Sequence, residues 1–315
     1  MRYFDLHCDT ITNCLDNNKK LAENDLHISL EKVRRIKNLE SYIQCFAAFV
    51  PDSMEGEEAF SYFLKAADKF DLELSKNKNE ILLCRMLGDI GKTVSNQKYG
   101  GILTVENGKA LGGRLENIEI MKERGVKILS LTWNAQNELG GGAFAKGDIG
   151  LTDFGRKAVP MLEKAGIVID LSHASDKLFY DTAKIAGKPF IASHSNARHI
   201  CSHPRNLTDE QILLICQSGG IIGLNFYRAF LNQDENAAAM EDIIRHADHI
   251  LSLGCENALA IGGDLDGAEL PGDMRDVAAI EDLYELFLSR NYEQSLADKI
   301  FYKNAERFFA ENNFL

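Results

Sequence analysis

The chain has 315 residues, 45% of them hydrophobic, and its 47 acidic and 35 basic side chains give a formal net charge of −12. This charge argues against nucleic acid or an anionic membrane as a partner, and the apolar content is sufficient for a large core. The seven cysteines are scattered without a Cys-x-x-Cys pair, as is typical of reduced thiols in the cytoplasm. No run of about 18 apolar residues occurs, and charged residues interrupt the start of the chain. We therefore expect a cytoplasmic protein that does not bind membranes.

Short apolar runs alternate with amphipathic stretches along the whole chain. Eight of the apolar runs predict strands, at residues 2–9, 41–50, 99–106, 126–133, 167–173, 189–194, 219–226 and 258–264. Helical periodicity or helix-end signals follow nearly all of them, at residues 57–76, 115–124, 153–165, 175–186, 237–253, 276–290 and 293–311 and after a capping box at 208–211. A long Gly-rich segment, residues 134–151, predicts an exposed and mobile loop.

Apolar strands that alternate with helices are typical of a parallel sheet covered by helices. Eight such units predict an α/β fold, a (β/α)8 TIM barrel of the metal-dependent hydrolase type that spans residues 1–315 as a single domain. A doubly wound open sheet is the competing architecture. The turn after the first strand lacks the Gly-rich phosphate motif that many such sheets carry, so the barrel is favoured.

The predicted strands end on residues of metal-ligand type. These residues are His7, Asp9, Glu106, His173, His194 and Asp264. The carboxyl ends of barrel strands converge on one mouth, so residues far apart in the sequence become neighbours there. A histidine at one strand end is more often structural, but six residues at equivalent positions favour a metal site. Three imidazoles and three carboxylates exceed the three protein ligands of a catalytic zinc, which indicates two ions that share a bridging carboxylate.

The remaining polar residues give weaker expectations. Asp5 is expected to lie beneath the site as a hydrogen-bond partner of a ligand, with an ion pair to a lysine or arginine as the alternative. His199 and His203 follow the sixth strand and are expected near the mouth. Three other histidines are expected to be solvated: His27, His246 and His249.

Several of these stretches resemble the membrane dipeptidase (renal dipeptidase) family of zinc peptidases. The matching motifs are Asp5-Leu-His-Cys-Asp9, Glu106-Asn-Gly108, Leu131-Thr132, Asp170-Leu-Ser-His173, Ser193-His-Ser195, Arg205-Asn206, Gly262-Gly-Asp-Leu-Asp-Gly267 and, more weakly, Lys303-Asn-Ala-Glu-Arg-Phe308. They occur in order over almost the whole chain. The resemblance implies a (β/α)8 barrel that holds two zinc ions, and it also implies a homodimer.

The resemblance further implies a role for each motif residue. His7 and Asp9 would bind one zinc ion, His173 and His194 the other, and Glu106 would bridge both. Asp264 is similar to the family's catalytic acid/base. Arg205 is similar to the residue that receives the substrate carboxylate, a role that suits a bidentate guanidinium.

One position departs from the mammalian members of the family. Where they have a histidine after Leu-Thr that contacts the substrate carbonyl or the oxyanion, this chain has Trp133. Tryptophan offers one N–H donor and cannot act as an imidazolium, so the substrate-binding role of this position is expected to differ. Asn134, Asn137 and Glu138 are the nearby polar candidates to replace the histidine.

The sequence therefore predicts a zinc-dependent dipeptidase that cleaves the amide bond of small substrates with a free terminal carboxylate, through a hydroxide between the two ions. The first alternative is another metal-dependent amidohydrolase, such as an N-acyl amino acid deacylase. Those barrels more often begin with His-x-His and use a lysine bridge, so His7-x-Asp9 with Glu106 counts against them. The second alternative is a metal-binding barrel without catalysis, which Trp133 alone supports.

Overall fold

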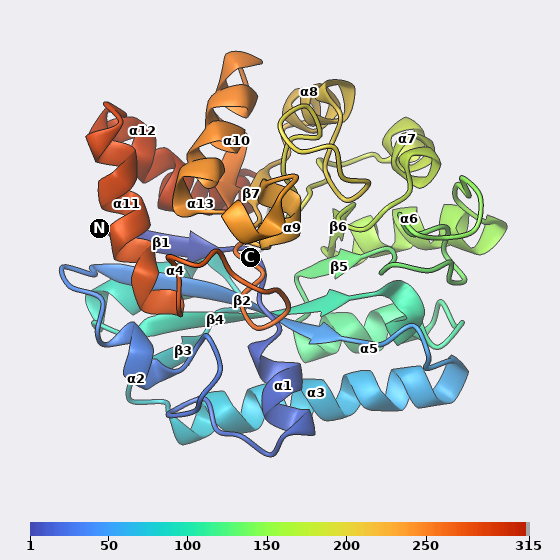
Figure 1. Cartoon of the computed structure of the whole chain (residues 1–315). Coiled ribbons are helices and arrows are strands. Elements are labelled where there is room, and N and C mark those ends of the chain that lie inside the picture. The colour runs from blue at the N-terminus through green and yellow to red at the C-terminus, as the bar shows by residue number, and fades with distance from the viewer. Residues whose placement is uncertain (313–315) are drawn as a thin grey trace.

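A curled parallel sheet surrounded by helices forms the molecule, and the computed structural model describes residues 1–312 of it (Figure 1). The strands of the ring are β1 (Arg2–Asp5), β2 (Ser41–Phe49), β4 (Tyr99–Glu106), β5 (Ile128–Ser130), β6 (Val168–Asp170), β7 (Ile222–Leu224) and β8 (Leu259–Ile261). Their order is β6-β5-β4-β2-β1-β8-β7, and each neighbouring pair is parallel.

Two isolated parallel bridges, Asp170↔Ile191 and Ala192↔Ile222, place residues 191–192 between β6 and β7 and close the ring. The predicted (β/α)8 barrel is thereby confirmed, although the sixth predicted strand is reduced to these two bridges. The structure also contains a short strand that was not predicted, β3 (Ile81–Leu83), which pairs with the start of β4.

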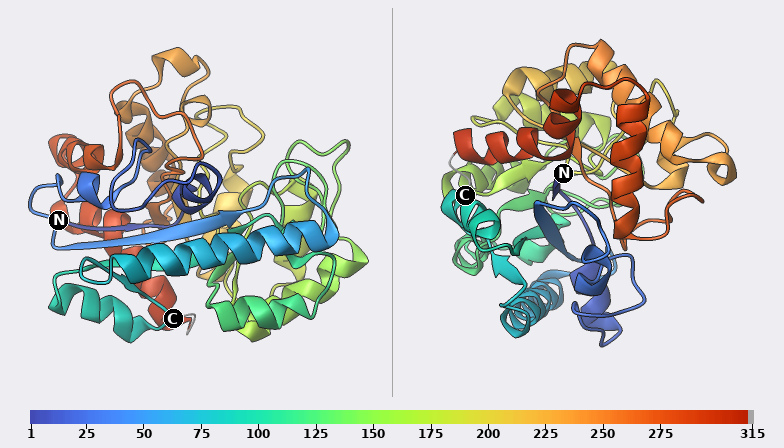
Figure 2. Two further views of the ribbon diagram at one scale, coloured as in Figure 1. Left: turned by 90° about the horizontal axis from the view of Figure 1, so that it is seen from below. Right: turned by 90° about the vertical axis from the view of Figure 1, so that its left-hand side faces the viewer.

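Helices surround the ring and close one end of it. They are α1 (Thr10–Asp16), α2 (Leu30–Val33), α3 (Gly56–Lys76), α4 (Leu87–Ser95), α5 (Asn117–Arg124), α6 (Asp153–Ala165), α7 (Asp176–Ile185), α8 (Asp209–Ser218), α9 (Arg228–Leu231), α10 (Met240–Ser252), α11 (Ile280–Ser289), α12 (Gln294–Asp298) and α13 (Asn304–Glu311). Among them α3 runs alongside β2, as both the front view and the view from below show (Figures 1 and 2). Its buried Phe63, Ala67, Phe70 and Leu74 recur every three or four residues on one face.

The C-terminal helices close the barrel at the end opposite to its mouth. Phe4 of β1 stacks on Phe309 of α13 with ring centroids 5.5 Å apart. Phe4, Ile43 and Ile102 belong to an apolar cluster inside the ring that Phe308 and Phe309 complete. Because apolar side chains fill this end, the polar residues of the barrel are concentrated at the opposite mouth, where the strands end.

The loop of residues 134–151 is less exposed than expected. Leu139 is fully buried, and two isolated antiparallel bridges, Gln136↔Gly141 and Gly142↔Ala174, fix its base. A Cβ atom at Gly142 would lie 2.1 Å from the carbonyl oxygen of Trp133, so this close approach requires glycine. Within residues 1–312, no helix combines the length and the hydrophobicity that a membrane span needs.

Candidate metal centre

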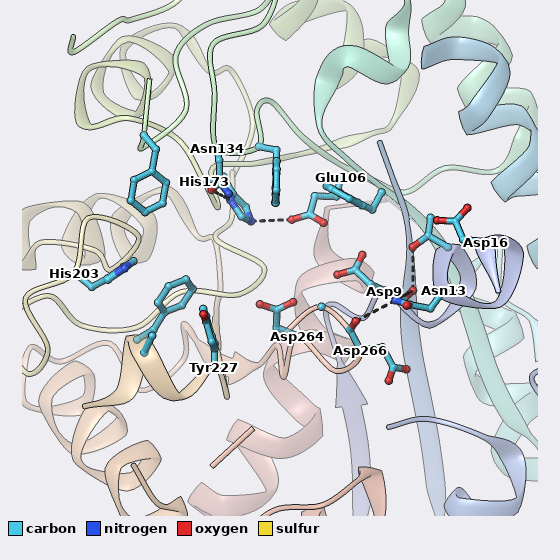
Figure 3. Close-up of a pocket in the computed structure, with 17 residues that line it drawn as sticks. Asp9, Asn13, Asp16, Glu106, Asn134, His173, His203, Tyr227, Asp264 and Asp266 are labelled. Carbon is cyan, nitrogen blue, oxygen red and sulfur yellow. Dashed lines mark hydrogen bonds and ion pairs between the residues drawn. The ribbon is translucent and has the colours of Figure 1, made fainter. Parts of the chain in front are cut away.

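The barrel mouth brings the six predicted ligand-type residues together, each of them buried. His7 Nε2 lies 3.6 Å from Asp9 Oδ2 and 3.6 Å from Glu106 Oε2. The other oxygen of Glu106, Oε1, lies 2.8 Å from His173 Nε2 and 3.6 Å from His194 Nε2. Glu106 therefore presents one oxygen to each of two groups of side chains. Figure 3 shows it beside His173 and across the cavity from Asp264.

Two of these residues follow their strands in an unusual backbone conformation. His173 has φ +68° and Asp264 has φ +57°, in the left-handed region that non-glycine residues rarely occupy. Such backbone conformations cost free energy and are concentrated at functional sites. They occur where the chain turns out of β6 and β8.

Hydrogen bonds to the far nitrogen of two histidines set which ring nitrogen faces the centre. His173 Nδ1 lies 3.1 Å from Asn134 Oδ1, which can only accept, so Nδ1 carries the proton. His194 Nδ1 lies 2.8 Å from Ser193 Oγ, which itself donates to Asp170 Oδ2 at 2.6 Å. His194 Nδ1 is therefore also the protonated nitrogen. Both Nε2 atoms then face the centre as lone pairs, the tautomer that a metal ligand needs.

The arrangement of lone pairs is unfavourable without a cation. The Nε2 atoms of His173 and His194 lie 2.9 Å apart, and Glu106 Oε1 is within reach of both. On the other side, Asp9 Oδ1 is buried without a hydrogen-bond partner, and the carboxylates of Asp9 and Glu106 each lie 3.6 Å from His7 Nε2. Acceptors that converge at such distances in a buried site repel one another unless a positive charge lies among them. The residues therefore fit a metal site.

Burial and neighbouring charges shift the pKa values of the cluster. Burial raises the pKa of Glu106 to about 8 and that of Asp264 to about 6, and the neighbouring carboxylate of Asp9 adds to both shifts. Burial, together with the positive charges of Arg205 and His7, holds the pKa values of His173 and His194 well below their usual range. A bound cation would counteract the raised pKa values of the carboxylates and would keep the two imidazoles neutral, because it favours ionised carboxylates and neutral imidazoles.

The two predicted substrate-contact residues lie close by. Arg205 is 4% exposed, its guanidinium lies 5.2 Å from the centroid of the Phe230 ring, and its Nη2 donates to the carbonyl of His194 at 3.4 Å. Its buried Nε has no hydrogen-bond partner. Trp133 lines the cavity, with its ring centroid 5.0 Å from that of Phe49 and 6.1 Å from that of His173.

The structure also places Asp5 and Asn137. Asp5 accepts from the backbone N–H groups of His7 and Gly263, each at 3.0 Å, and from the Tyr3 hydroxyl at 2.7 Å. It is therefore a hydrogen-bond partner of the ligand-type residue His7, as expected, but through the backbone of His7, and it fixes β1 against the end of β8. Asn137 is committed elsewhere, since its amide donates to Asn107 Oδ1 and to the carbonyl of Leu131.

The histidines outside the mouth also differ from expectation. His246 is fully buried in α10, where its Nδ1 accepts from the N–H of Ala197 at 3.1 Å. His249 lies 2.7 Å from Asp209 Oδ1 and stacks against His199. His203, in contrast, lines the cavity near the mouth as expected.

Sequence reasoning missed the residues that support the centre. Asp170, Ser193 and Asn225 are all buried. Ser193 hydrogen-bonds to His194 and Asn225 to Asp264, and Asp170 hydrogen-bonds to Ser193. The sequence does indicate Asp170, because it lies at the carboxyl end of an apolar strand and three residues before His173. Ser193 also belongs to a family motif, Ser193-His-Ser195, but the sequence pattern assigned it no role.

The cavity above these residues has a volume of about 490 Å³. Figure 3 shows Asp9, Asn13 and Asp16 at one end of it, His203 and Tyr227 at the other, and Glu106 and Asp264 between them. Aromatic side chains, Phe144 and Phe230, belong to the lining as well.

A TIM barrel with buried imidazoles and carboxylates around a cavity at the carboxyl ends of its strands defines the class of metal-dependent hydrolases. The sequence profile of the membrane dipeptidase family, peptidase family M19, matches residues 1–314. The chain therefore belongs to the membrane dipeptidase family, and it is a hydrolase of the dipeptidase class.

Individual relatives agree with this assignment. The chain is 31% identical to an uncharacterised protein in the pqqA 5′ region of Klebsiella pneumoniae, over 73% of this chain and 89% of that protein. It is 29% identical to mouse dipeptidase 3 over 85% of this chain, and it spans 55% of the length of that protein.

Solved structures share the whole fold. The dipeptidase AC, a metallopeptidase of family M19, has a TM-score of 0.92 at 25% identity, with 99% of this chain and 98% of that chain covered. A metallopeptidase from Rhodobacter sphaeroides, liganded with a phosphinate mimic of L-Ala-D-Ala, has a TM-score of 0.92 at 24% identity, with 99% of each chain covered.

Proposed function

We propose that this chain is a dipeptidase that binds two zinc ions and hydrolyses the amide bond of short substrates with a free terminal carboxylate. His7 and Asp9 would hold one ion, His173 and His194 the other, and Glu106 would contact both. The observation that carries this proposal is the position of Glu106, with one oxygen 3.6 Å from His7 Nε2 and the other 2.8 Å from His173 Nε2. When bound, the ions polarise the scissile carbonyl and lower the pKa of the attacking water.

Asp264 is proposed as the general base and acid. Its Oδ1 lies 3.9 Å from His7 Nε2, at the edge of the centre, and its Oδ2 accepts from the Asn225 amide at 3.0 Å. This hydrogen bond fixes the carboxylate while it remains in contact with the cavity. From there Asp264 can take the proton of the attacking water and transfer it to the leaving amine.

Arg205 is proposed to bind the terminal carboxylate of the substrate. Its guanidinium is buried, lies over the ring of Phe230, which lines the cavity, and has an unpartnered Nε. A carboxylate can accept two parallel hydrogen bonds from a guanidinium, which fixes its distance from the scissile bond. Substrates that extend beyond this residue would lack the carboxylate at that position, so the site selects dipeptides.

Trp133 is proposed to shape the cavity by apolar contact. It packs against Phe49 and lies near His173, where its ring contributes surface rather than a charge. We also propose that residues 1–315 act as one catalytic domain, since β1 and α13, from the two ends of the chain, pack together through Phe4 and Phe309.

The test is a panel of L,L-dipeptides, L,D-dipeptides and N-acyl amino acids with the zinc-loaded protein. We expect hydrolysis of dipeptides and a strong loss of activity in Asp264→Asn. Preferential hydrolysis of N-acyl amino acids would instead identify a deacylase. Metal binding without hydrolysis of any member of the panel would show that the barrel is not catalytic.

A further inference from the structure

One wall of the cavity is polar and comes from a single helix face. Asp9, Thr12, Asn13 and Asp16 all line the cavity, and their spacing of three, four and seven residues places them on one side of α1 and its N-terminal flank. We call these four residues the α1 wall. Figure 3 shows Asp9, Asn13 and Asp16 at the end of the cavity opposite to His203.

The acceptor atoms of the α1 wall are held in place but not neutralised. The Tyr62 hydroxyl lies 2.8 Å and 2.9 Å from the two oxygens of Asp16, so the partner of this carboxylate is a phenol and not a cation. Asn13 Nδ2 donates to the carbonyls of Asp9 and Asp266, at 3.2 Å and 3.0 Å, which leaves its Oδ1 as an acceptor. Asp9 Oδ1, on the same wall, is buried without a partner.

The charge of the cavity is strongly one-sided. Five carboxylates line it, those of Asp9, Asp16, Glu106, Asp264 and Asp266, and its lining includes neither lysine nor arginine. The Asp266 carboxylate already has hydrogen-bond partners within the protein, because its oxygens accept from the Thr10 hydroxyl and from two backbone N–H groups. Three of the others surround the proposed metal centre. Asp16 therefore remains as the negative charge that neither a metal ion nor a lysine or arginine compensates.

The orientation of the bound dipeptide determines which part of it the α1 wall contacts, and this step rests on the proposed function. Arg205 lies against Phe230, which packs beside His203 and Tyr227 at the end of the cavity opposite to the α1 wall. A substrate with its terminal carboxylate on Arg205 and its scissile bond between Glu106 and Asp264 directs its amino-terminal residue toward α1. The α1 wall then faces the side chain of that residue.

Distance determines whether the α-ammonium group or the side chain of the substrate's amino-terminal residue can reach Asp16. Asp16 follows Asp9 by seven residues, which corresponds to about 10 Å along the helix axis. The α-ammonium is two bonds from the scissile carbonyl and stays near the centre, close to Asp9. Only an extended side chain can reach Asp16 from there, and a terminal positive charge on that side chain would pair with the Asp16 carboxylate.

We propose that the α1 wall selects substrates whose amino-terminal residue carries a positively charged side chain, lysine or arginine, with Asp16 as the residue that determines this specificity. Tyr62 acts as a positioning residue, since its hydroxyl orients the Asp16 carboxylate.

The experiment compares kcat/KM of the zinc-loaded enzyme for dipeptides that share their second residue and begin with lysine, arginine, norleucine or glutamate. Norleucine matches the lysine side chain without its charge. We expect lysine to exceed norleucine by roughly tenfold, the effect of one charge-assisted hydrogen bond, and glutamate to be the poorest. In Asp16→Asn the lysine-to-norleucine ratio is expected to fall to about one. In Tyr62→Phe it is expected to fall in part.

Glu23→Gln is the matched control, because it removes an exposed carboxylate that lies outside the cavity lining. Its ratio is expected to equal that of the unmodified enzyme. A ratio near one in the unmodified enzyme, or a preference for lysine that persists in Asp16→Asn, overturns the inference. Equal cleavage of all four substrates refutes this inference alone, whereas cleavage of none of them refutes the proposed dipeptidase function.

Discussion

Substitution of Ser193 by alanine isolates the contribution of a supporting hydrogen bond to the metal centre. Ser193 Oγ accepts from His194 Nδ1 at 2.8 Å and donates to Asp170 Oδ2 at 2.6 Å. Ser193→Ala removes this link and leaves a buried N–H of His194 without a partner. Asp170 retains the N–H groups of Ser172 and Ser193 and the Ser130 hydroxyl, so the fold is expected to lose only about 1 kcal/mol.

The effect on the metal is expected to be larger. Loss of a supporting hydrogen bond to a ligand histidine typically lowers metal affinity by about 10- to 100-fold, or about 1.4 to 2.7 kcal/mol. The assay is a competition titration of the zinc-free protein against a chelator of known affinity. The weakened site should be the one that contains His194.

Ser195→Ala is the matched control for this experiment. Ser195 flanks His194 on the other side, is equally buried, and its Oγ has no hydrogen-bond partner. The same loss of one hydroxyl should therefore leave zinc affinity unchanged. Equal affinities in the two variants would refute the inference that Ser193 orients His194.

Three further predictions concern catalysis and stability. Asp264→Asn should retain two zinc ions by metal analysis and lose at least 100-fold in kcat; full activity contradicts its role as acid and base. Arg205→Met should lower kcat/KM for dipeptides by about 10- to 100-fold, whereas an unchanged value places the substrate carboxylate elsewhere. Burial lowers the pKa of His246 to about 4, so its stabilising effect is complete above pH 6.5 and is lost as the pH falls toward 4. The difference in unfolding free energy between the unmodified protein and His246→Gln should therefore shrink by about 2 kcal/mol from pH 7 to pH 5, and a constant difference in denaturant titrations would show that His246 does not titrate in this way.

The sequence was most informative where hydrophobic runs end on polar residues. His7, Glu106 and His194 could be predicted to meet because parallel strands of a barrel end at one mouth. The family motifs then added Arg205 and the acid/base role of Asp264. These predictions depend on topology, which the alternation of strands and helices encodes over the whole chain.

Other features depend on contacts that no local pattern encodes. His246 was predicted to be solvated from its polarity, yet it lies among the buried Ile243, Ala247 and Ile250 of α10 and bonds to a distant backbone. The short β3 strand has only three residues and was missed. The left-handed backbone at His173 could not be predicted either, because the surrounding structure imposes it.

The most direct test of the metal centre is anomalous diffraction at the zinc absorption edge from crystals of active enzyme. The proposed function predicts two peaks at the barrel mouth, one beside His7 and Asp9 and one beside His173 and His194, with Glu106 between them. A single peak, peaks away from these side chains, or full activity in crystals without a zinc signal would contradict it.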